Sequence, residues 1–291
     1  MRKVTILMIV VMQCITAWAQ DKPSEPSKAG KRFFVGLSWS YTSIDLKLSS
    51  LSFHSVWFGS DLGTRDLESG EIDTINDFVK RHTDINTLRI EAGMDFINKP
   101  DSRWKLSGTL LLGLAQNLTT VHNNETGVQE YSFNSGFSKP CLGLGINLGY
   151  QFTKHWGLSL RPYVVGTMGT IKDINDKINP DPINFTSDKQ DKFSTLYLRS
   201  SLLARYTAGP VTIMAGPGFY YVWSKHVYRR NYTNINDGQT LTEEATYVLI
   251  PRSFIDGNLA VVWNIIDQLT FHVSAGIAND FMLDAGLHYN F

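Results

Sequence analysis

The last twelve residues, DFMLDAGLHYNF (280–291), decide the fold class of the chain. Apolar and aromatic side chains occupy every second position up to the terminal Phe291, while the carboxylates Asp280 and Asp284 stand in the alternate register. A period of two over this length predicts a β-strand with one apolar face and one polar face. A strand in the wall of a transmembrane barrel has this character, because its apolar face meets lipid and its polar face meets the lumen.

Nine further segments show the same alternation, and together with the closing stretch they predict an all-β fold of about ten strands. Residues 141–152 are the most regular, with Leu, Ile, Tyr and Phe on one register and Gly, Asn, Gln and Cys141 on the other. Residues 46–57 also alternate in places, which leaves counts of eight, ten or twelve strands open. The ten predicted strands are residues 33–42, 87–96, 104–115, 141–152, 156–167, 195–206, 211–223, 253–263, 269–277 and 280–291.

The links between these segments alternate between short and long. Links of a few residues alternate with links of roughly twenty residues or more that are rich in Asn, Asp, Gly and Ser. This alternation predicts a closed antiparallel transmembrane β-barrel with short periplasmic turns, long extracellular loops and both termini in the periplasm. The link at 278–279 is the exception, because it falls on the outer side and is short.

Two features modify this regular pattern. Pro162, Pro217 and Pro251 lie in or beside predicted strands, where the missing N–H predicts bulges or bends. The first long loop carries apolar side chains at helical spacing, so either a short amphipathic helix on the barrel rim or a partly ordered loop is expected there. The residues at this spacing are Ile72, Ile75, Phe78, Val79 and His82.

The N-terminal segment has the features of a secretory signal peptide. Two basic residues precede a short apolar run, and a cleavage site of small residues ends at Ala19. We therefore assign residues 1–19 to the signal peptide, 20–32 to a disordered periplasmic lead-in and 33–291 to the barrel. After the signal peptide, no apolar run approaches the ~20 residues that a transmembrane helix requires.

The C-terminal pattern carries a resemblance to a known family. Asp284, Gly286, Tyr289 and Phe291 match the order polar, any, Gly, any, any, aromatic, any, aromatic that closes many outer-membrane barrels. With its alternating strands, the chain resembles the small porin-like outer-membrane β-barrel domain family of Gram-negative bacteria. The resemblance implies an outer-membrane location, contact with outer-membrane lipid, and two partners during biogenesis: periplasmic chaperones and the barrel-assembly machinery, which reads the terminal pattern as an insertion signal. It describes an architecture and establishes neither a pore nor a surface ligand.

The ionisable residues on the inward register form the candidate site. A ten-stranded barrel is only slightly wider than the eight-stranded kind, whose interior is filled by side chains. Because unpaired buried charges are expensive, we expect a paired network that fills the lumen, the alternative being a charged constriction in a narrow channel. If the last turn closes around Ala278, His272 lies opposite Asp284 and pairs with it. The predicted network comprises Arg89, Glu91, Asp95, Lys105, Arg161, Arg199, Arg205, Asp256, His272, Asp280 and Asp284.

The sequence predicts no enzymatic activity, no cofactor and no metal site. The ten-stranded omptin proteases use an Asp pair and an Asp-x-His pair, and this chain contains neither Asp-x-Asp nor Asp-x-His. Ser/His hydrolysis stays open because triad members need not be adjacent in sequence, although His54, His122 and His226 fall in predicted loops. No set of His, Cys and carboxylate residues has metal-ligand spacing on one face. With 27 basic and 27 acidic residues and no basic tract, the chain has no nucleic-acid footprint.

These patterns favour an outer-membrane barrel with a largely filled lumen and a structural or surface-interaction role. One alternative is a narrow porin-like channel for small solutes, which requires an open lumen. The other is a barrel hydrolase, which requires a reactive site above the membrane.

Overall fold

The computed structural model describes residues 33–57, 60–97, 102–171, 174–176, 185–277 and 281–291. The predicted signal peptide, the lead-in and Asp280 lie outside these ranges. Strands make up most of the described chain. The elements are β1 (Phe33–Trp57), β2 (Ser60–Asp66), α2 (Ser69–Phe78), β3 (Val79–Ile97), β4 (Trp104–Asn123), β5 (Gln129–Asn134), β6 (Lys139–Gln151), β7 (Trp156–Leu160), β8 (Tyr163–Ile171), β9 (Ile174–Asp176), β10 (Phe185–Ala208), β11 (Val211–Asn234), β12 (Thr240–Pro251), β13 (Ile255–Ile266), β14 (Leu269–Ile277) and β15 (Phe281–Asn290).

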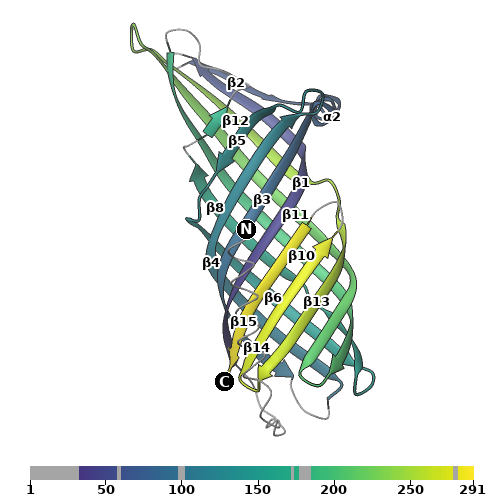
Figure 1. Ribbon diagram of the computed structural model, residues 1–291. Helices are drawn as coiled ribbons and strands as arrows, with labels where there is room; N and C mark the ends of the chain where they lie inside the picture. Colours follow the sequence, from purple (N-terminus) through teal and green to yellow (C-terminus); the bar gives the residue numbers. More distant parts are fainter. Residues whose placement is uncertain (1–32, 58–59, 98–101, 172–173, 177–184, 278–280) are drawn as a thin grey trace.

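Ten strands close into one antiparallel ring (Figure 1). In hydrogen-bonded order they are β1, β3, β4, β6, β8, β10, β11, β13, β14 and β15, and β15 pairs back to β1. Three of them continue through short breaks, since β5 leads into β6, β7 and β9 flank β8, and β12 leads into β13. We call the end near Phe291 and the short links the turn end, and the opposite end the loop end. The predicted closed antiparallel barrel of about ten strands is confirmed.

The β14–β15 hairpin occupies only the turn-end half of the wall. Residues 34–43 of β1 pair with β15, but residues 46–57 pair with β12. In the same way, β11 pairs with β13 over residues 211–219 and with β12 over residues 224–233. The hairpin is therefore a wedge between β13 and β1, so ten strands line the turn end and eight continue towards the loop end. This arrangement explains why the link at 278–279 is short, and it narrows the barrel above the wedge.

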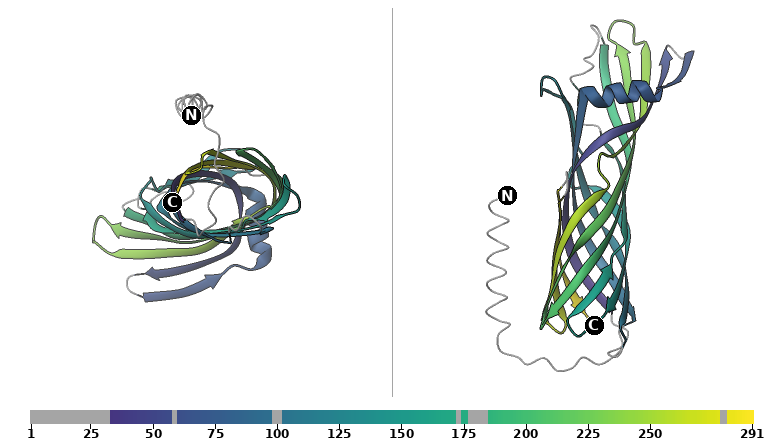
Figure 2. Two further views of the ribbon diagram at one scale, coloured as in Figure 1. Left: turned by 90° about the horizontal axis from the view of Figure 1, so that it is seen from below. Right: turned by 90° about the vertical axis from the view of Figure 1, so that its right-hand side faces the viewer.

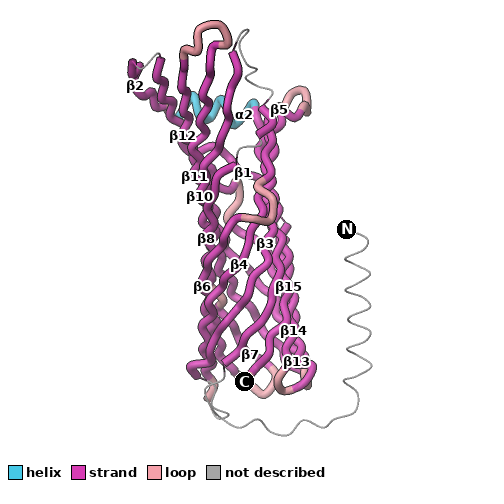
Figure 3. Tube along the Cα trace, turned by 90° about the vertical axis from the view of Figure 1, so that its left-hand side faces the viewer, coloured by secondary structure: helices cyan, strands magenta, loops and turns pink. Residues whose placement is uncertain are grey.

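The two faces of the wall exchange character part of the way along the strands. On β1, Val35 and Leu37 point outward and are 43% and 55% exposed. Farther along the same strand, Ile44, Leu46 and Leu48 point inward and are at most 3% exposed. The alternation between them continues without a register shift, so the apolar residues have moved from the outer face to the inner face. Five strands, β1, β3, β4, β10 and β11, run without a break from one half to the other (Figure 3).

Neighbouring strands change character at the same level. On β3 the outward Leu88 is exposed and the next outward residue towards the loop end is Asn86, while on β11 Trp223 is followed by Lys225. Trp39 lies at this boundary on β1, where it pairs with Leu88. An apolar outer belt bordered by aromatic side chains is what a transmembrane barrel presents to lipid. The turn-end half is therefore the membrane-spanning part.

The loop-end half, which we call the extension, has a polar outside and an apolar interior. It consists of β2, α2, β5, β9 and β12 together with the loop-end parts of β1, β3, β4, β10 and β11. Its outward charges make surface pairs, such as Lys80 Nζ with Asp45 Oδ2 at 2.9 Å. Burial raises the pKa of Asp45, but hydrogen bonds from His82 and Lys80 outweigh this effect and lower it overall. Its interior holds the largest apolar cluster of the described chain, centred on Leu46, Tyr220 and Leu249.

The helix α2 crosses the loop end of the barrel (Figure 2). It begins with a capping box between Glu68 and Glu71, and Ile72 is buried in the apolar cluster below it. The Asn76 side chain accepts a hydrogen bond from the Leu48 N–H at 2.8 Å and donates one to the Leu48 carbonyl at 2.9 Å, next to a register shift in β1. No helix among the described residues is both long and apolar enough to cross a membrane.

Several predicted boundaries were wrong, and for one reason. The strand predicted at 87–96 extends as β3 over Val79–Ile97, which includes Val79 and His82, two residues that the helical spacing had assigned to the loop. The strands predicted at 195–206 and 211–223 extend to Phe185–Ala208 and Val211–Asn234, and part of the loop predicted after residue 223 is strand. Beyond the boundary the polar face is the outer one, so a search for an apolar outer face ends too early.

The prolines interrupt the wall where bulges or bends were predicted. Pro162 lies between β7 and β8, and Pro251 is the last residue of β12. At Pro217 the pairing of β10 with β11 lapses between the pairs Ser201–Gly218 and Ala204–Ala215. Each interruption is consistent with the missing proline N–H.

Candidate functional site

Arg89 lies at the centre of the lumen charges. It projects inward from β3, and its Nη2 donates to Asp284 on β15, while its Nε donates to Ser38 Oγ on β1 at 3.2 Å. Glu91 Oε1 is 3.7 Å from the same Nη2 and also accepts a hydrogen bond from Ser38. Arg89 and Glu91 are 4% and 7% exposed. One guanidinium therefore balances two carboxylates that come from different strands.

Two histidines complete this cluster. His272 Nε2 is 3.0 Å from Asp284 Oδ1, and His288 Nε2 is 2.9 Å from Glu91 Oε2. The two imidazole rings are 4.7 Å apart between centroids. The predicted contact between His272 and Asp284 is present, although His272 is paired in register with Gly286 and reaches Asp284 diagonally. A Cβ at Gly286 would collide with the His272 ring, so the glycine leaves room for this contact.

A second cluster surrounds Arg199 on β10. Its Nη2 donates to Asp256 Oδ2 at 2.8 Å and also to Asn258, and Asn258 Nδ2 donates to Asp256 Oδ1 at 2.6 Å. A Cβ at Gly276 would meet the Arg199 guanidinium, and one at Gly218 would meet Asp256 and Asn258. The cluster is thus closed by direct bonds and by glycines that make space for them. An inward glycine in a predicted strand therefore indicates that a large side chain from a neighbouring strand fills the space beside it.

The other predicted network residues are placed separately. Arg205 donates to Gln151 near the turn end. Lys105 and Asp95 line the lumen, and Arg161 projects into it from the break between β7 and β8. Asp280 lies outside the described residues. The structure thus gathers most of the predicted set into two clusters and leaves Arg161 beside them.

The membrane-spanning half of the lumen contains a cavity of about 560 Å³, which we call the turn-end cavity. It reaches Asn264 and Asp267, which lie in and beside an exposed turn, so solvent enters it from the turn end. Its charged wall is formed by Arg89, Glu91, Asp95, Lys105, Arg161, Arg199, Asp267 and Asp284, with His272 and His288 between them.

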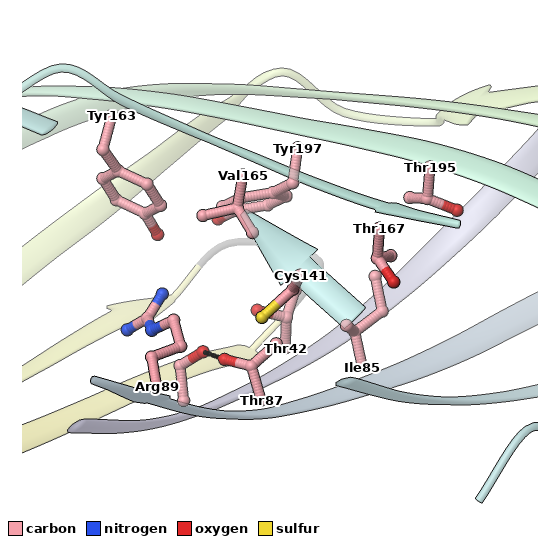
Figure 4. Close-up of a pocket in the computed structure, with 11 residues that line it drawn as sticks. Thr42, Ile85, Thr87, Arg89, Cys141, Tyr163, Val165, Thr167, Thr195 and Tyr197 are labelled. Carbon is pink, nitrogen blue, oxygen red and sulfur yellow. Dashed lines mark hydrogen bonds between the residues drawn. The ribbon is translucent and has the colours of Figure 1, made fainter. Parts of the chain in front are cut away.

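An apolar layer closes the lumen above this cavity. Ile44, Tyr220 and Val222 are 0% exposed, and Tyr197 O–H donates to Met282 Sδ at 2.8 Å. A small void of about 30 Å³ lies between the layer and Arg89, bordered by hydroxyl side chains and the buried Cys141 (Figure 4). Arg89 and Tyr163 line both this void and the turn-end cavity. The lumen is therefore hollow in one half and filled in the other.

The sequence reasoning missed a hydrogen-bonded chain inside the extension. His226, predicted in a loop, is a buried residue of β11, because β11 continues past the membrane boundary. Its Nε2 is 2.9 Å from Ser224 Oγ and its Nδ1 is 3.0 Å from Asp191 Oδ2. Tyr247 O–H donates to the same Asp191 oxygen at 2.9 Å, and burial raises the pKa of Tyr247, which keeps it a donor. The i, i+2 spacing of Ser224 and His226 was the signal that they share a face.

This chain has the order of a Ser–His–Asp triad, but it is closed to substrates. Ser224, His226 and Asp191 are 4%, 2% and 0% exposed. The imidazole is stacked on Tyr247 with 4.8 Å between ring centroids and also lies against Phe193. Nucleophilic catalysis requires a carbonyl beside the hydroxyl and donors for the oxyanion. In this packing the Ser224 hydroxyl is enclosed by other side chains, so the arrangement is a structural polar core.

Among the described residues, no group of three or more His, Cys, Asp and Glu side chains is arranged to hold a metal ion. The turn-end cavity contains two carboxylate–imidazole pairs, and in each pair the two groups are hydrogen-bonded to each other: His272 with Asp284, and His288 with Glu91. Its wall combines guanidinium, carboxylate and imidazole groups with hydroxyl and amide groups.

Comparisons with known proteins find only distant similarity, to solved structures of outer-membrane proteins. No family model and no curated protein matches the chain. It is similar to the outer membrane protein OprG from Pseudomonas aeruginosa, with 11% identity, a TM-score of 0.32 and coverage of 92% of this chain and 99% of that one. It is also similar to the translocator domain of autotransporter NalP from Neisseria meningitidis, with 7% identity, a TM-score of 0.41 and coverage of 99% of this chain and 96% of that one. The outer membrane protease OmpT from Escherichia coli matches with 9% identity, a TM-score of 0.37 and coverage of 94% of this chain and 100% of that one. All three are outer-membrane β-barrels, and at these identities and TM-scores they carry no argument about function.

Proposed function

We propose that the chain is an outer-membrane barrel that does not conduct solutes and that presents its extension outside the cell for contact with a partner. The observation that carries the proposal is the exchange of faces along single strands, at Leu37 and Leu46 on β1 for example. Because the outer face becomes polar at this level, the extension lies outside the lipid, and because the inner face becomes apolar, side chains fill the lumen of the extension. In this orientation the turn end and the C-terminus lie in the periplasm.

The apolar layer supports the non-conducting part of the proposal. Its side chains come from β1, β10, β11, β12 and β15, and Ile72 of α2 belongs to the same cluster. A solute would have to displace buried side chains such as Tyr220 and Leu249 to pass. The second candidate, a narrow channel, is favoured by the turn-end cavity, but this cavity ends below the layer.

The surface of the extension supports the contact part of the proposal. Phe53, Val128 and Ile235 are exposed on it, at 43%, 53% and 65%, although they lie beyond the lipid-facing belt. A contiguous apolar patch is what marks an interaction surface, and these three side chains lie on one strand and two turns, so the contact role rests mainly on the position of the extension beyond the lipid. The role we propose is non-enzymatic, because Ser224, the hydroxyl of the hydrogen-bonded chain, is buried.

Two measurements test orientation and conduction. Proteinase K added to intact cells is expected to cut the β11–β12 turn at residues 235–239, and the purified chain in planar bilayers is expected to show no steady current steps. Protection of the turn in intact cells, with cleavage only after the outer membrane is opened, would refute the orientation. Steady single-channel steps would refute the closed lumen and support the channel.

The terminal strand is proposed to be the assembly signal, read through Asp284, Gly286, Tyr289 and Phe291. Deletion of Phe291 alone is expected to lower the amount of folded barrel in the outer membrane severalfold and to leave unfolded chain with periplasmic chaperones. Phe291 is 72% exposed, so its loss removes little packing from the barrel. Heat-modifiable gel mobility of membrane fractions measures the folded amount, and refolding in detergent is the control. Equal folded amounts in cells would contradict the signal.

A further inference from the structure

Arg161 is a lumen arginine whose charge interacts with Asp284 and Glu91 only through space. Its backbone N–H donates to the Ser201 carbonyl at 3.0 Å, and Pro162 follows it at the break between β7 and β8. Its side chain lines the turn-end cavity. Within the described ranges it makes no ion pair and no side-chain hydrogen bond, whereas Arg89 and Arg199 are bonded to acidic side chains.

The acidic groups nearest to the deep end of this cavity are already engaged. Asp284 is bonded to Arg89 and His272, and Glu91 is bonded to Ser38 and His288. Among the described residues, the fork of N–H donors of Arg161 therefore has no direct hydrogen bond, and it lies in a cavity that opens at the turn end. Such a fork matches a carboxylate in a two-point contact.

The wall beside Arg161 is rich in groups that bind hydroxyls. Ser107, Thr109, Asn147 and Ser201 line the cavity together with it. Gly145 also lines it, and a Cβ there would make only ordinary contacts, at 3.5 Å from the Tyr163 Cβ, so this part of the wall is open. The cavity of about 560 Å³ lies within the range of roughly 300–1,000 Å³ typical of small-ligand sites.

We propose that the turn-end cavity binds a small hydroxylated carboxylate, of the sugar-acid class, with the carboxylate on Arg161 and the hydroxyls on the Ser, Thr and Asn wall. The ligand enters from the turn end and stops at the apolar layer. The cavity is thus a one-ended binding site. It stands on the lumen geometry alone, independently of what the extension contacts.

A ligand panel on the purified full chain tests the chemical class. Isothermal titration calorimetry with glucuronate, glucose, acetate and inorganic phosphate separates the two recognised groups. Glucuronate is expected to bind at least tenfold more tightly than glucose, which lacks the carboxylate, and than acetate, which lacks the hydroxyls. Absence of glucuronate binding, or phosphate binding as tight as glucuronate binding, would overturn the assignment.

Variants test the residue. Arg161→Gln is expected to weaken glucuronate binding at least tenfold, while Arg205→Gln, a lumen arginine bonded to Gln151 outside the cavity wall, leaves it unchanged. Heat-modifiable mobility reports whether each variant is folded. If Arg161→Gln does not fold, Thr109→Val removes one wall hydroxyl at nearly constant volume and is expected to weaken glucuronate binding but not acetate binding. Unchanged glucuronate affinity in a folded Arg161→Gln or Thr109→Val variant would contradict the site.

Discussion

Replacement of Arg89 by methionine is expected to lower the free energy of unfolding by about 3–5 kcal/mol, the usual cost of removing one partner from a buried ion pair. Methionine keeps much of the arginine's length but has no charge. Asp284 would then keep its contact with His272, and Glu91 its contacts with Ser38 and His288, but the neighbouring guanidinium charge would be lost. Reversible urea unfolding in lipid vesicles, followed by tryptophan fluorescence, measures the change.

The control for Arg89 is a variant with the carboxylates neutralised as well. Arg89→Met combined with Asp284→Asn and Glu91→Gln is expected to recover a large part of the loss, because no buried charge is left without a partner. Arg205→Met, near the turn end, is expected to cost much less. A triple variant as unstable as Arg89→Met alone would show that packing, and not charge balance, is what Arg89 contributes.

Replacement of Leu46 by aspartate is expected to destabilise the barrel by at least about 3 kcal/mol, since it removes a buried apolar side chain and buries an unpaired carboxylate. Leu46 is 1% exposed inside the extension. The adjacent Lys47 points outward and is exposed, so Lys47→Asp is expected to change stability by less than about 0.5 kcal/mol.

This pair of variants tests the exchange of faces directly. On the membrane-spanning part of the same strand, Leu37 points outward, so Leu37→Asp places a charge in lipid and is expected to block insertion. The three variants are compared by folded yield and by unfolding in urea. A tolerated Leu46→Asp together with a damaging Lys47→Asp would mean that the outer face stays apolar along the whole strand.

The fold class was predictable because the alternation of apolar and polar residues in a barrel strand can be recognised within the strand's own sequence. Residues 141–152 and 280–291 alternate over their own length, and no distant contact is needed to recognise them. The position of His272 beside Asp284 was predictable for the same reason, since only one short turn separates the two strands. The diagonal displacement of the pair was not, because it depends on where that turn closes.

The rest depended on contacts between distant parts of the chain. Nothing near Leu46 shows that β12 replaces β15 as its neighbour, so the narrowing of the barrel could not be read from single strands. The burial of His226 follows from the same replacement. Arg161 was predicted among the lumen charges, but only its surroundings in the structure show that its side chain makes no direct hydrogen bond or ion pair with the described residues.

The β14–β15 wedge divides the closure of the ring into two seams. β1 joins β12 through eleven residue pairs and β15 through ten, so the two seams are of similar length. The β1–β12 seam uses only residues up to Pro251, whereas the β1–β15 seam uses the C-terminal strand. The β1–β12 seam at the loop end can therefore form without β14 and β15, whereas the turn end closes only when this hairpin is added. The hairpin that widens the barrel is thus also the segment that completes its wall, and it carries the terminal residues 284–291.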